Sequence, residues 1–367
     1  MKTYPLKSIN IEEAMELQFK LIDKITREFP GHEFITRGDL GVVSGLNKPV
    51  TTQKAERVIA GFFDAESSLL VRGAGTGAIR YGLFSVMKAG ETLLVHKAPV
   101  YNTTKTSIEM MGLKTVCADF NQLSEIEVVM NNHPEIKAAL VQYTRQRIED
   151  SYEIEEVIQK IKNTRQIPVI TDDNYAVMKV SKIGSQHGAD LSCFSTFKLL
   201  GPEGIGCLVG KKEYIDILAE HHYSGGMQTQ GFEALEVIKG LVYAPVALAI
   251  QGMVNEELVT RLNKGEIPQV KQAYLANAQS KVLLVEFKEE IAMDVLKHAE
   301  QLGAAPNPIG AESKYEMVPM FYRISGTFRS ADQTLEKRMI RINPMRAGAE
   351  TVMRILKESI ERAGLCS

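Results

Sequence analysis

Short apolar runs alternate with amphipathic segments through the middle of the chain. The runs SSLLVR, ETLLVH, KTVCADF, KAALVQY, IPVITDD, ADLSCFSTFK and IGCLVG are mostly separated by segments whose apolar residues recur at helical spacing. Strands that alternate with helices in this way are typical of a mostly parallel sheet covered on both faces. The pattern therefore predicts an α/β fold whose large domain has a mostly parallel, seven-stranded-type sheet with helices on both faces.

The pattern changes at both ends of the chain. Residues 9–29 and 51–63 repeat apolar positions at helical spacing, and the polar, glycine-rich residues 31–47 between them predict an ordered loop. Beyond the boundary candidate GEIP, at 265–268, strand-like and helical segments form a smaller C-terminal α+β block. The predicted domains are an N-terminal helix and loop at 1–50, a large domain at 51–262 and a small domain at 263–367.

Composition narrows the functional class. The 367 residues are 44% hydrophobic and 24% charged with a net charge of −2, which argues against a nucleic-acid or membrane partner. The N-terminus lacks the apolar core of a signal peptide, and we find no run close to membrane-spanning length. The four cysteines lack C-x-x-C spacing and the histidines lack ligand spacing, so we expect a cytoplasmic protein with no metal site.

A lysine and an aspartate stand where apolar strands run out into loops. Lys198 precedes a glycine-rich turn, where a desolvated amine would be nucleophilic. Asp173 lies 25 positions earlier, at the end of IPVIT, and a carboxylate buried there needs a cationic partner. The alternatives without a catalytic role are that Lys198 is a surface lysine at a strand end and that Asp173 is a cap or turn residue. Asp172 is a rival, because adjacent strand residues face opposite sides of the sheet.

The glycine stretch GAGTGA, at 73–78, follows a strand and opens a helix. Backbone N–H groups and the helix dipole at such a turn suit a phosphate. The stretch also matches the loose dinucleotide pattern G-x-G-x-x-A, but no acid stands about 20 residues further on to bind a ribose. A phosphate site is the favoured interpretation, and a purely structural turn is the alternative.

Two further side chains stand near strands. Tyr101 follows the strand ETLLVH and could stack on a flat heterocycle or pack under a loop. Arg341, in MIRINP, has apolar neighbours, and its fork suits a carboxylate from a substrate or from an internal acid. Arg346 is the less attractive alternative.

Together these residues resemble the fold-type-I pyridoxal-phosphate enzymes, the aspartate aminotransferase superfamily. The resemblance covers about residues 35–350 and is nearest to the class V aminotransferases, the cystathionine and methionine lyases and selenocysteine-synthase-like proteins. In the lyase branch an Asp-Asn pair precedes the Schiff-base lysine by the interval that separates Asp173 from Lys198 here. This spacing favours Asp173 over Asp172.

The resemblance implies a role for each residue. Lys198 would form the Schiff base with pyridoxal 5'-phosphate and move the proton at the substrate Cα, and Arg341 would bind the substrate carboxylate. It implies a homodimer with shared active sites. The implied cofactor-binding residues are Lys198, Asp173, Gly75, Thr76, Gly77, Tyr101 and Ser195.

The chain also departs from the family pattern. Where many relatives have an asparagine for the cofactor's ring oxygen, this sequence offers Arg145 or Gln146. Arg37, Gln228 and Thr229 are weaker candidates for residues that cross between subunits. The resemblance predicts an enzyme of small amino acids, an aminotransferase first and a β/γ-eliminating C–S lyase second. Two alternative hypotheses come from other functional classes: a nucleotide-binding dehydrogenase, and a relative that keeps the fold without catalytic activity.

Overall fold

The computed structural model describes residues 2–145, 147–276, 282–310, 312–324 and 334–365. Its contacts divide the chain into two compact units. Unit 1 comprises Met1–Ile11, Arg145–Asp150 and Val246–Ser367, and unit 2 comprises Glu12–Thr144 and Ser151–Pro245. The predicted domain boundaries, after residues 50 and 262, stay predictions.

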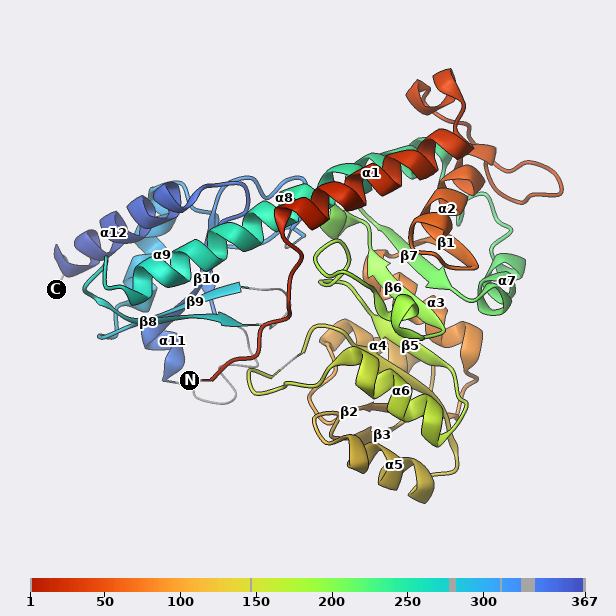
Figure 1. Cartoon of the computed structure of the whole chain (residues 1–367), viewed down its shortest axis with the longest axis horizontal. Helices are drawn as coiled ribbons and strands as arrows, with labels where there is room; N and C mark the ends of the chain where they lie inside the picture. The colour runs from red at the N-terminus through yellow and green to blue at the C-terminus, as the bar shows by residue number, and fades with distance from the viewer. Residues whose placement is uncertain (1, 146, 277–281, 311, 325–333, 366–367) are drawn as a thin grey trace. The chain divides into compact units, whose positions relative to one another are not determined.

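Unit 2 is built on a seven-stranded sheet (Figure 1). The strand order is β1-β7-β6-β5-β4-β2-β3, and β7 runs antiparallel to both of its neighbours while the other pairs are parallel. The predicted mostly parallel sheet is therefore confirmed. Its strands are β1 (Ser67–Arg72), β2 (Thr92–His96), β3 (Lys114–Ala118), β4 (Ile136–Gln142), β5 (Val169–Asp172), β6 (Leu191–Ser195) and β7 (Ile205–Gly210).

The central strands are buried on both faces, which explains why they appear in the sequence as continuous apolar runs. Gly82 of α3 lets that helix approach the sheet, since a Cβ there would lie 2.9 Å from the Cys193 sulfur. The longer helices that lie wholly or partly in unit 2 are α1 (Ile11–Glu28), α2 (Val50–Phe62), α3 (Ala74–Val86), α4 (Asn102–Met110), α5 (Leu123–Asn132), α6 (Ile154–Thr164), α7 (Lys212–His221) and α8 (Gly231–Asn263).

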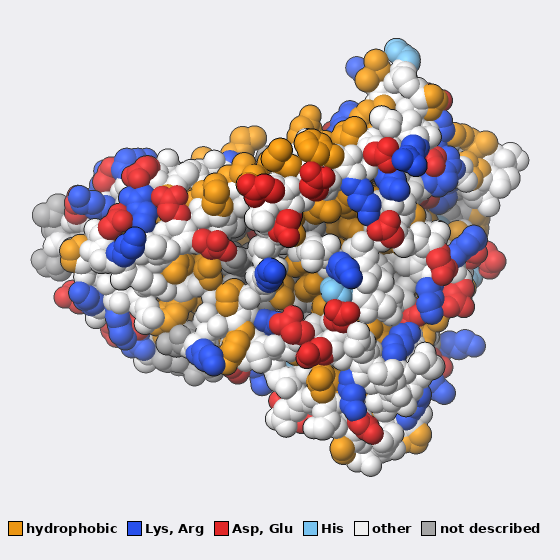
Figure 2. Space-filling model, viewed as in Figure 1, with side chains coloured by type: hydrophobic (Ala, Val, Ile, Leu, Met, Phe, Trp, Pro, Cys, Tyr) orange, Lys and Arg blue, Asp and Glu red, His pale blue; other side chains and the backbone are white. Residues whose placement is uncertain are grey.

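The first helix is apolar on two sides. Ala14, Leu21 and Ile25 are buried, which agrees with the amphipathic pattern of the sequence. Hydrophobic side chains also line the outer side of α1 in the space-filling view (Figure 2). The exposed apolar residues of α1 are Met15, Phe19 and Ile22.

Unit 1 holds a four-stranded antiparallel sheet in the order β10-β11-β9-β8. One face packs on α9 (Ala292–Gln301) and α12 (Ala349–Leu365), and Ile148 packs against the smaller core on the other. The predicted C-terminal α+β block is confirmed. The strands are β8 (Val270–Ala276), β9 (Val282–Phe287), β10 (Met320–Arg323) and β11 (Met339–Asn343), and α11 (Leu335–Arg338) precedes β11.

The helix α8 is exceptional in length and composition. Within the described residues it alone is long and apolar enough to cross a membrane on those two criteria. The expectation that no segment approaches this size is therefore wrong for α8. Of its most apolar 18-residue window, 61% is buried within the protein, as in the core helices of many proteins.

Candidate active site

The predicted site residues of unit 2 gather at the edge of the sheet where the parallel strands end. β1 ends at Arg72 and leads into the glycine turn, β5 ends at Asp172, and β6 ends at Ser195, three residues before Lys198. These strands are parallel, so their carboxyl ends share one edge, where ligands bind in open α/β sheets.

Lys198 lies in a short 3₁₀ turn, Phe197–Leu199, directly after β6. Its side chain is half-buried, and its Nζ lies 3.7 Å from the centroid of the Tyr175 ring. The backbone that follows is tightly held, since a Cβ on Gly201 would lie 2.8 Å from the Thr196 carbonyl oxygen and one on Gly240 of α8 2.6 Å from the Gly201 nitrogen. This packing holds the backbone that follows Lys198 in place.

The two adjacent aspartates face different sides of the sheet. Asp172 is the last residue of β5 and pairs in register with Cys193, whose sulfur faces α3 at Gly82. Asp173 accepts a hydrogen bond from the Gly184 N–H at 2.9 Å, on the other side. Asp172 therefore shares the α3 face, and the glycine turn stands at the N-terminus of α3.

Both carboxyl groups are buried, and their electrostatics differ. Burial raises the pKa of Asp172, and hydrogen bonds from Asn174 and the positive charge of Lys198 oppose that rise. Burial also raises the pKa of Asp173 to about 6, partly offset by neighbouring hydrogen-bond donors and increased by the charge of Asp172. Asp173 Oδ1 has no hydrogen-bond partner among the described residues. A further positive charge beside the two carboxyl groups would therefore stabilise their ionised forms.

Asn174 links three parts of this edge. Its Nδ2 donates to Asp172 Oδ1 at 2.7 Å, and its Oδ1 accepts from the Ser195 N–H at 2.9 Å. A Cβ on Gly75 would lie 2.0 Å from the same Oδ1. The ends of β5 and β6 and the glycine turn are therefore held against one another through one side chain.

The glycine turn has the form of an anion site. Gly73 takes a left-handed φ of 96°, its carbonyl accepts the Gly77 N–H at 2.8 Å, and its own N–H donates to Gly204. The N–H groups of Gly75 and Thr76 lie in the first turn of α3, where a helix provides no acceptor for its own donors. A Cβ on Gly77 would lie 2.2 Å from the Arg72 carbonyl oxygen, so the tight turn requires glycine there.

Tyr101 immediately precedes α4 and is 39% exposed. Thr103, two residues later, hydrogen-bonds through its hydroxyl to the Thr76 hydroxyl at 2.9 Å, which places the start of α4 beside the glycine turn. The structure thus brings the segment that carries Tyr101 to the same edge as Thr76.

The arginine candidates belong to unit 1. The Arg341 guanidinium stacks 4.1 Å from the Tyr322 ring centroid and its Nε donates to the Arg323 carbonyl at 2.9 Å. Arg346 donates to Gln251 Oε1 at 3.4 Å. Their roles toward a substrate stay predictions.

The candidates for the cofactor's ring oxygen and for contacts between subunits have other surroundings. Arg145 is buried and donates to the Tyr4 carbonyl at 2.5 Å, whereas Gln146 lies outside the described residues. Gln228 and Thr229 are buried within unit 2, where their carbonyls accept hydrogen bonds from Arg72 and Thr52. The carbonyls of both residues thus serve contacts within their own unit.

Sequence reasoning gave no role to Tyr175 and used Asn174 only to recognise the lyase-like pair. Tyr175 stands two to three residues after the paired aspartates, in the loop that leaves β5. The presence of an aromatic residue in that loop could have marked Tyr175 as a site residue. Its contact with Lys198, however, is seen only in the folded chain.

Comparisons with known proteins agree with this geometry. The family model for class-V aminotransferases matches residues 51–239, and the model for the YhfS-like C-terminal domain matches residues 256–356. The uncharacterized protein YhfS of Escherichia coli K12 is 55% identical, over 98% of this chain and 99% of that protein.

Solved structures show the same relationship. The crystal structure of the pyridoxal-5'-phosphate-dependent protein YhfS from Escherichia coli superposes with a TM-score of 0.97 at 54% identity, over 99% of this chain and all of that one. The methionine γ-lyase CalE6 of Micromonospora echinospora has a TM-score of 0.72 at 15% identity, over 94% of this chain and 98% of that one. The second likeness shows the fold alone.

Pyridoxal phosphate is the cofactor of this chain, and the described residues fit it. The glycine turn offers unpaired first-turn N–H groups to a phosphate. Two buried, adjacent carboxyl groups with raised pKa values suit a protonated ring nitrogen. The half-buried amine of Lys198 stands over an aromatic ring in the same unit.

Proposed function

This chain belongs to the class-V aminotransferase family and to the group of YhfS, and from that premise we propose that it is a pyridoxal-phosphate-dependent aminotransferase of a small amino acid. The observation that carries the proposal is the Lys198 amine, beside Tyr175 and in the electrostatic field of Asp172, at the carboxyl edge of the sheet. A lysine there can both bind the cofactor covalently and carry a proton.

When bound, pyridoxal phosphate supplies an aldehyde that condenses with amines and a ring that takes up the electron pair left at Cα. Lys198 accepts the proton from the substrate Cα and returns it during the reaction. Transamination requires that return at the carbon that carried the aldehyde. The packing around Gly201 holds the backbone from which the Lys198 side chain extends.

The other residues bind and orient. The N–H groups of Gly75 and Thr76 hold the phosphate, with the Ser195 hydroxyl as a further donor. A carboxylate keeps the ring nitrogen protonated, and the face that Asp172 shares with α3 supports Asp172 in this role. The interval of 25 residues to Lys198 instead favours Asp173 as the partner of the ring nitrogen. The assignments to Asp172 and to Asp173 make different predictions. Arg341 binds the substrate carboxylate.

The runner-up is a lyase that eliminates a Cβ or Cγ substituent. It is supported by the interval from Asp173 to Lys198, which matches the lyase branch. Both reactions begin with the same proton transfer to Lys198. They differ in whether the proton then returns or a leaving group departs, which product analysis separates.

The test is product analysis over a panel of amino acids with the purified holoenzyme. Stoichiometric keto acid with no free ammonia, and turnover only when a second keto acid is added, supports an aminotransferase. Free ammonia together with keto acid and a released thiol supports the lyase. Neither product from any amino acid, in protein that holds the cofactor, contradicts both.

A further inference from the structure

The helix α8 contacts both the residue that precedes the glycine turn and the backbone that follows Lys198. Its first contact is Glu233, whose carboxylate accepts two parallel hydrogen bonds from Arg72, from Nη1 at 2.5 Å and from Nη2 at 2.6 Å. Arg72 is the last residue of β1 and directly precedes the glycine turn. Two parallel bonds between an arginine and a carboxylate fix both the distance and the orientation of the two side chains.

Arg72 also supports the glycine turn through its backbone. A Cβ on Gly77 would lie 2.2 Å from the Arg72 carbonyl oxygen, so the first turn of α3 packs on this residue. Arg72 Nη2 further donates to the Gln228 carbonyl at 3.0 Å, and Glu233 Oε2 accepts the Gln230 N–H at 2.8 Å. The residue on which the glycine turn packs is thereby held against the start of α8.

The second contact lies further along α8. A Cβ on Gly240 would lie 2.6 Å from the Gly201 nitrogen and 2.7 Å from the Leu200 carbonyl carbon, so the helix meets backbone rather than flexible side chains. Leu200 has a left-handed φ of 62° and follows the 3₁₀ turn that carries Lys198. A movement of α8 at Gly240 would therefore displace the backbone next to Lys198.

The two contact points share one face of α8. Glu233 and Gly240 are seven positions apart (240 − 233), which is about two helical turns, and residues at that interval lie on the same side of a helix. The helical rise places them roughly 10.5 Å apart along the axis. The proline within α8, Pro245, lies beyond both points, so it does not interrupt the helix between them.

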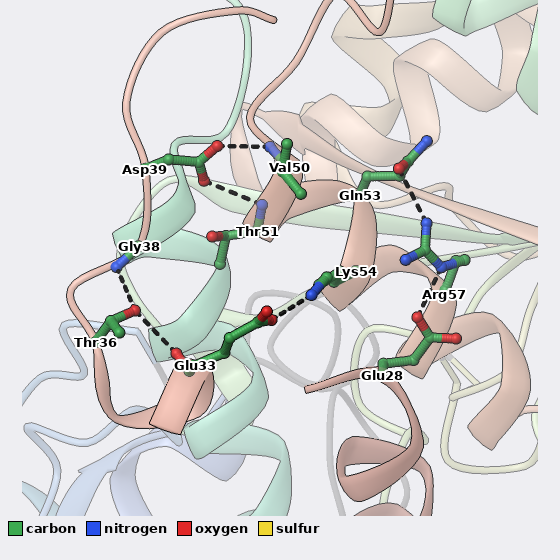
Figure 3. Close-up of polar contacts among 10 residues, drawn as sticks. All are labelled: Glu28, Glu33, Thr36, Gly38, Asp39, Val50, Thr51, Gln53, Lys54 and Arg57. Atoms are coloured by element: carbon green, nitrogen blue, oxygen red, sulfur yellow. Dashed lines mark hydrogen bonds and ion pairs between the residues drawn. The ribbon is translucent and has the colours of Figure 1, made fainter. Parts of the chain in front are cut away.

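The start of α8 is itself anchored. The Asp39 carboxylate accepts the N–H groups of Val50 and Thr51 at 2.7 and 3.0 Å and so caps α2 (Figure 3). The Asp39 carbonyl accepts the Gly231 N–H at 3.0 Å, and a Cβ on Gly38 would lie 2.6 Å from the Gly231 carbonyl carbon. The helix therefore cannot slide along its axis without breaking these contacts.

We propose that residues 233–240 of α8 form a spacer that sets the distance between the glycine turn and Lys198. Arg72 and Glu233 are positioning residues at one end of the spacer, and Gly240 permits the close contact at the other. The phosphate and the aldehyde of pyridoxal phosphate project from one rigid ring, so the groups that bind them must stand at a fixed separation. The inference rests on the proposed roles of the glycine turn and of Lys198.

The two ends of the spacer act on different parts of the cofactor. Loss of the contact between Arg72 and Glu233 loosens the glycine turn and affects any ligand that brings the phosphate, including pyridoxamine phosphate, which has an amine in place of the aldehyde. Displacement of the backbone at Gly240 affects Lys198, and only a ligand that condenses with the lysine responds to it. Contacts that only stabilised the fold would not separate the two ligands.

The test measures the dissociation constants of pyridoxal phosphate and pyridoxamine phosphate from the full-length apoprotein by equilibrium dialysis. Arg72→Gln and Glu233→Gln should each weaken both ligands by about tenfold or more, and the double variant should be no weaker than either, because both changes remove one contact. Arg57→Gln is the matched control, because Arg57 forms a partly exposed pair with Glu28 of α1 (Figure 3). It should leave both constants unchanged.

The other end of the spacer has its own variant. Gly240→Ala should weaken pyridoxal phosphate by about tenfold or more and change the constant for pyridoxamine phosphate by less than about threefold. Gly252→Ala is its control on the same helix, because a Cβ on Gly252 would meet no atom within 4 Å. This control should keep the wild-type constants for both ligands.

Circular dichroism and urea unfolding verify that each apoprotein is folded. Folded Arg72→Gln and Glu233→Gln variants with wild-type affinity for both ligands would overturn the proposal, and they decide it even where Gly240→Ala does not fold. A folded Gly240→Ala variant that weakens both ligands equally, or neither, would also overturn it. A wild type that attaches pyridoxal phosphate to a lysine other than Lys198 would instead contradict the proposed function, so the two failures are distinguishable.

Discussion

Replacing Asp173 with asparagine should change how the stability of the apoenzyme depends on pH. The Asp173 carboxyl is fully buried, and its pKa is raised from 3.8 to about 6. Between these values the folded protein keeps a proton that the unfolded chain has lost, so stability falls as pH rises through the window. The full loss is about 3 kcal/mol, of which about 2 kcal/mol lies between about pH 4.5 and about pH 7.5.

The variant lacks this titration. Asparagine keeps an oxygen for the Gly184 N–H but places an amide where Oδ1 has no described partner, which adds a cost of its own. That cost does not depend on pH. The quantity to measure is therefore how the difference in unfolding free energy between wild type and variant changes with pH. We expect this difference to shift by about 2 kcal/mol in favour of the variant at the higher pH.

Urea unfolding of the apoproteins at both pH values, followed by circular dichroism, gives this difference. Asp216→Asn is the control, because the Asp216 side chain is 53% exposed on α7. Wild type and Asp173→Asn with parallel pH profiles would refute the reasoning from burial.

The same titration of the holoenzyme decides between the aspartates. If Asp173 pairs with the protonated ring nitrogen, the ion pair offsets the cost of ionisation and the pH difference disappears on adding cofactor. If Asp172 pairs with it, the difference persists. The face that Asp172 shares with α3 leads us to expect persistence.

Three substitutions test the remaining parts of the site. Asp172→Asn should lower kcat by up to about a thousandfold while the cofactor stays bound, since a buried charge pair is worth about 4 kcal/mol; an unchanged rate would return the role to Asp173. Arg341→Ala should raise the KM for the amino acid by at least about tenfold, with Arg341→Lys between it and the wild type; equal KM values in all three would rule out carboxylate binding. Gly75→Ala should weaken cofactor affinity in equilibrium dialysis by about tenfold or more, because its Cβ would displace Asn174 beside the glycine turn; wild-type affinity would show that the turn is not the phosphate site.

The sequence predicted the sheet because its central strands are buried on both faces and therefore appear as unbroken apolar runs. It predicted the glycine turn and the lysine because both stand next to such runs. These are local signals. The two-unit division by contacts, which assigns Arg145–Asp150 to unit 1, depends on packing between distant segments.

The choice between the aspartates depends on where β5 ends. A shift of one residue at a strand end turns the side chain to the other face, and an interval along the chain does not contain that information. The contact between Lys198 and Tyr175 likewise exists only after β5 and β6 pair. The exposure of the aliphatic side chains at residues 35–43 could not be predicted either, because the glycines and polar residues of this segment predicted only an ordered loop.

The most direct test of the account is where the cofactor attaches. Purified protein with pyridoxal phosphate should show the visible absorbance of a lysine-bound cofactor, and borohydride reduction followed by peptide mass spectrometry should place the label on Lys198. Lys198→Ala should lose both signals, and Lys179→Ala should keep them, although Lys179 also lies over the Tyr175 ring, at 5.7 Å. A label on another lysine, or an unchanged band in Lys198→Ala, would contradict the central claim.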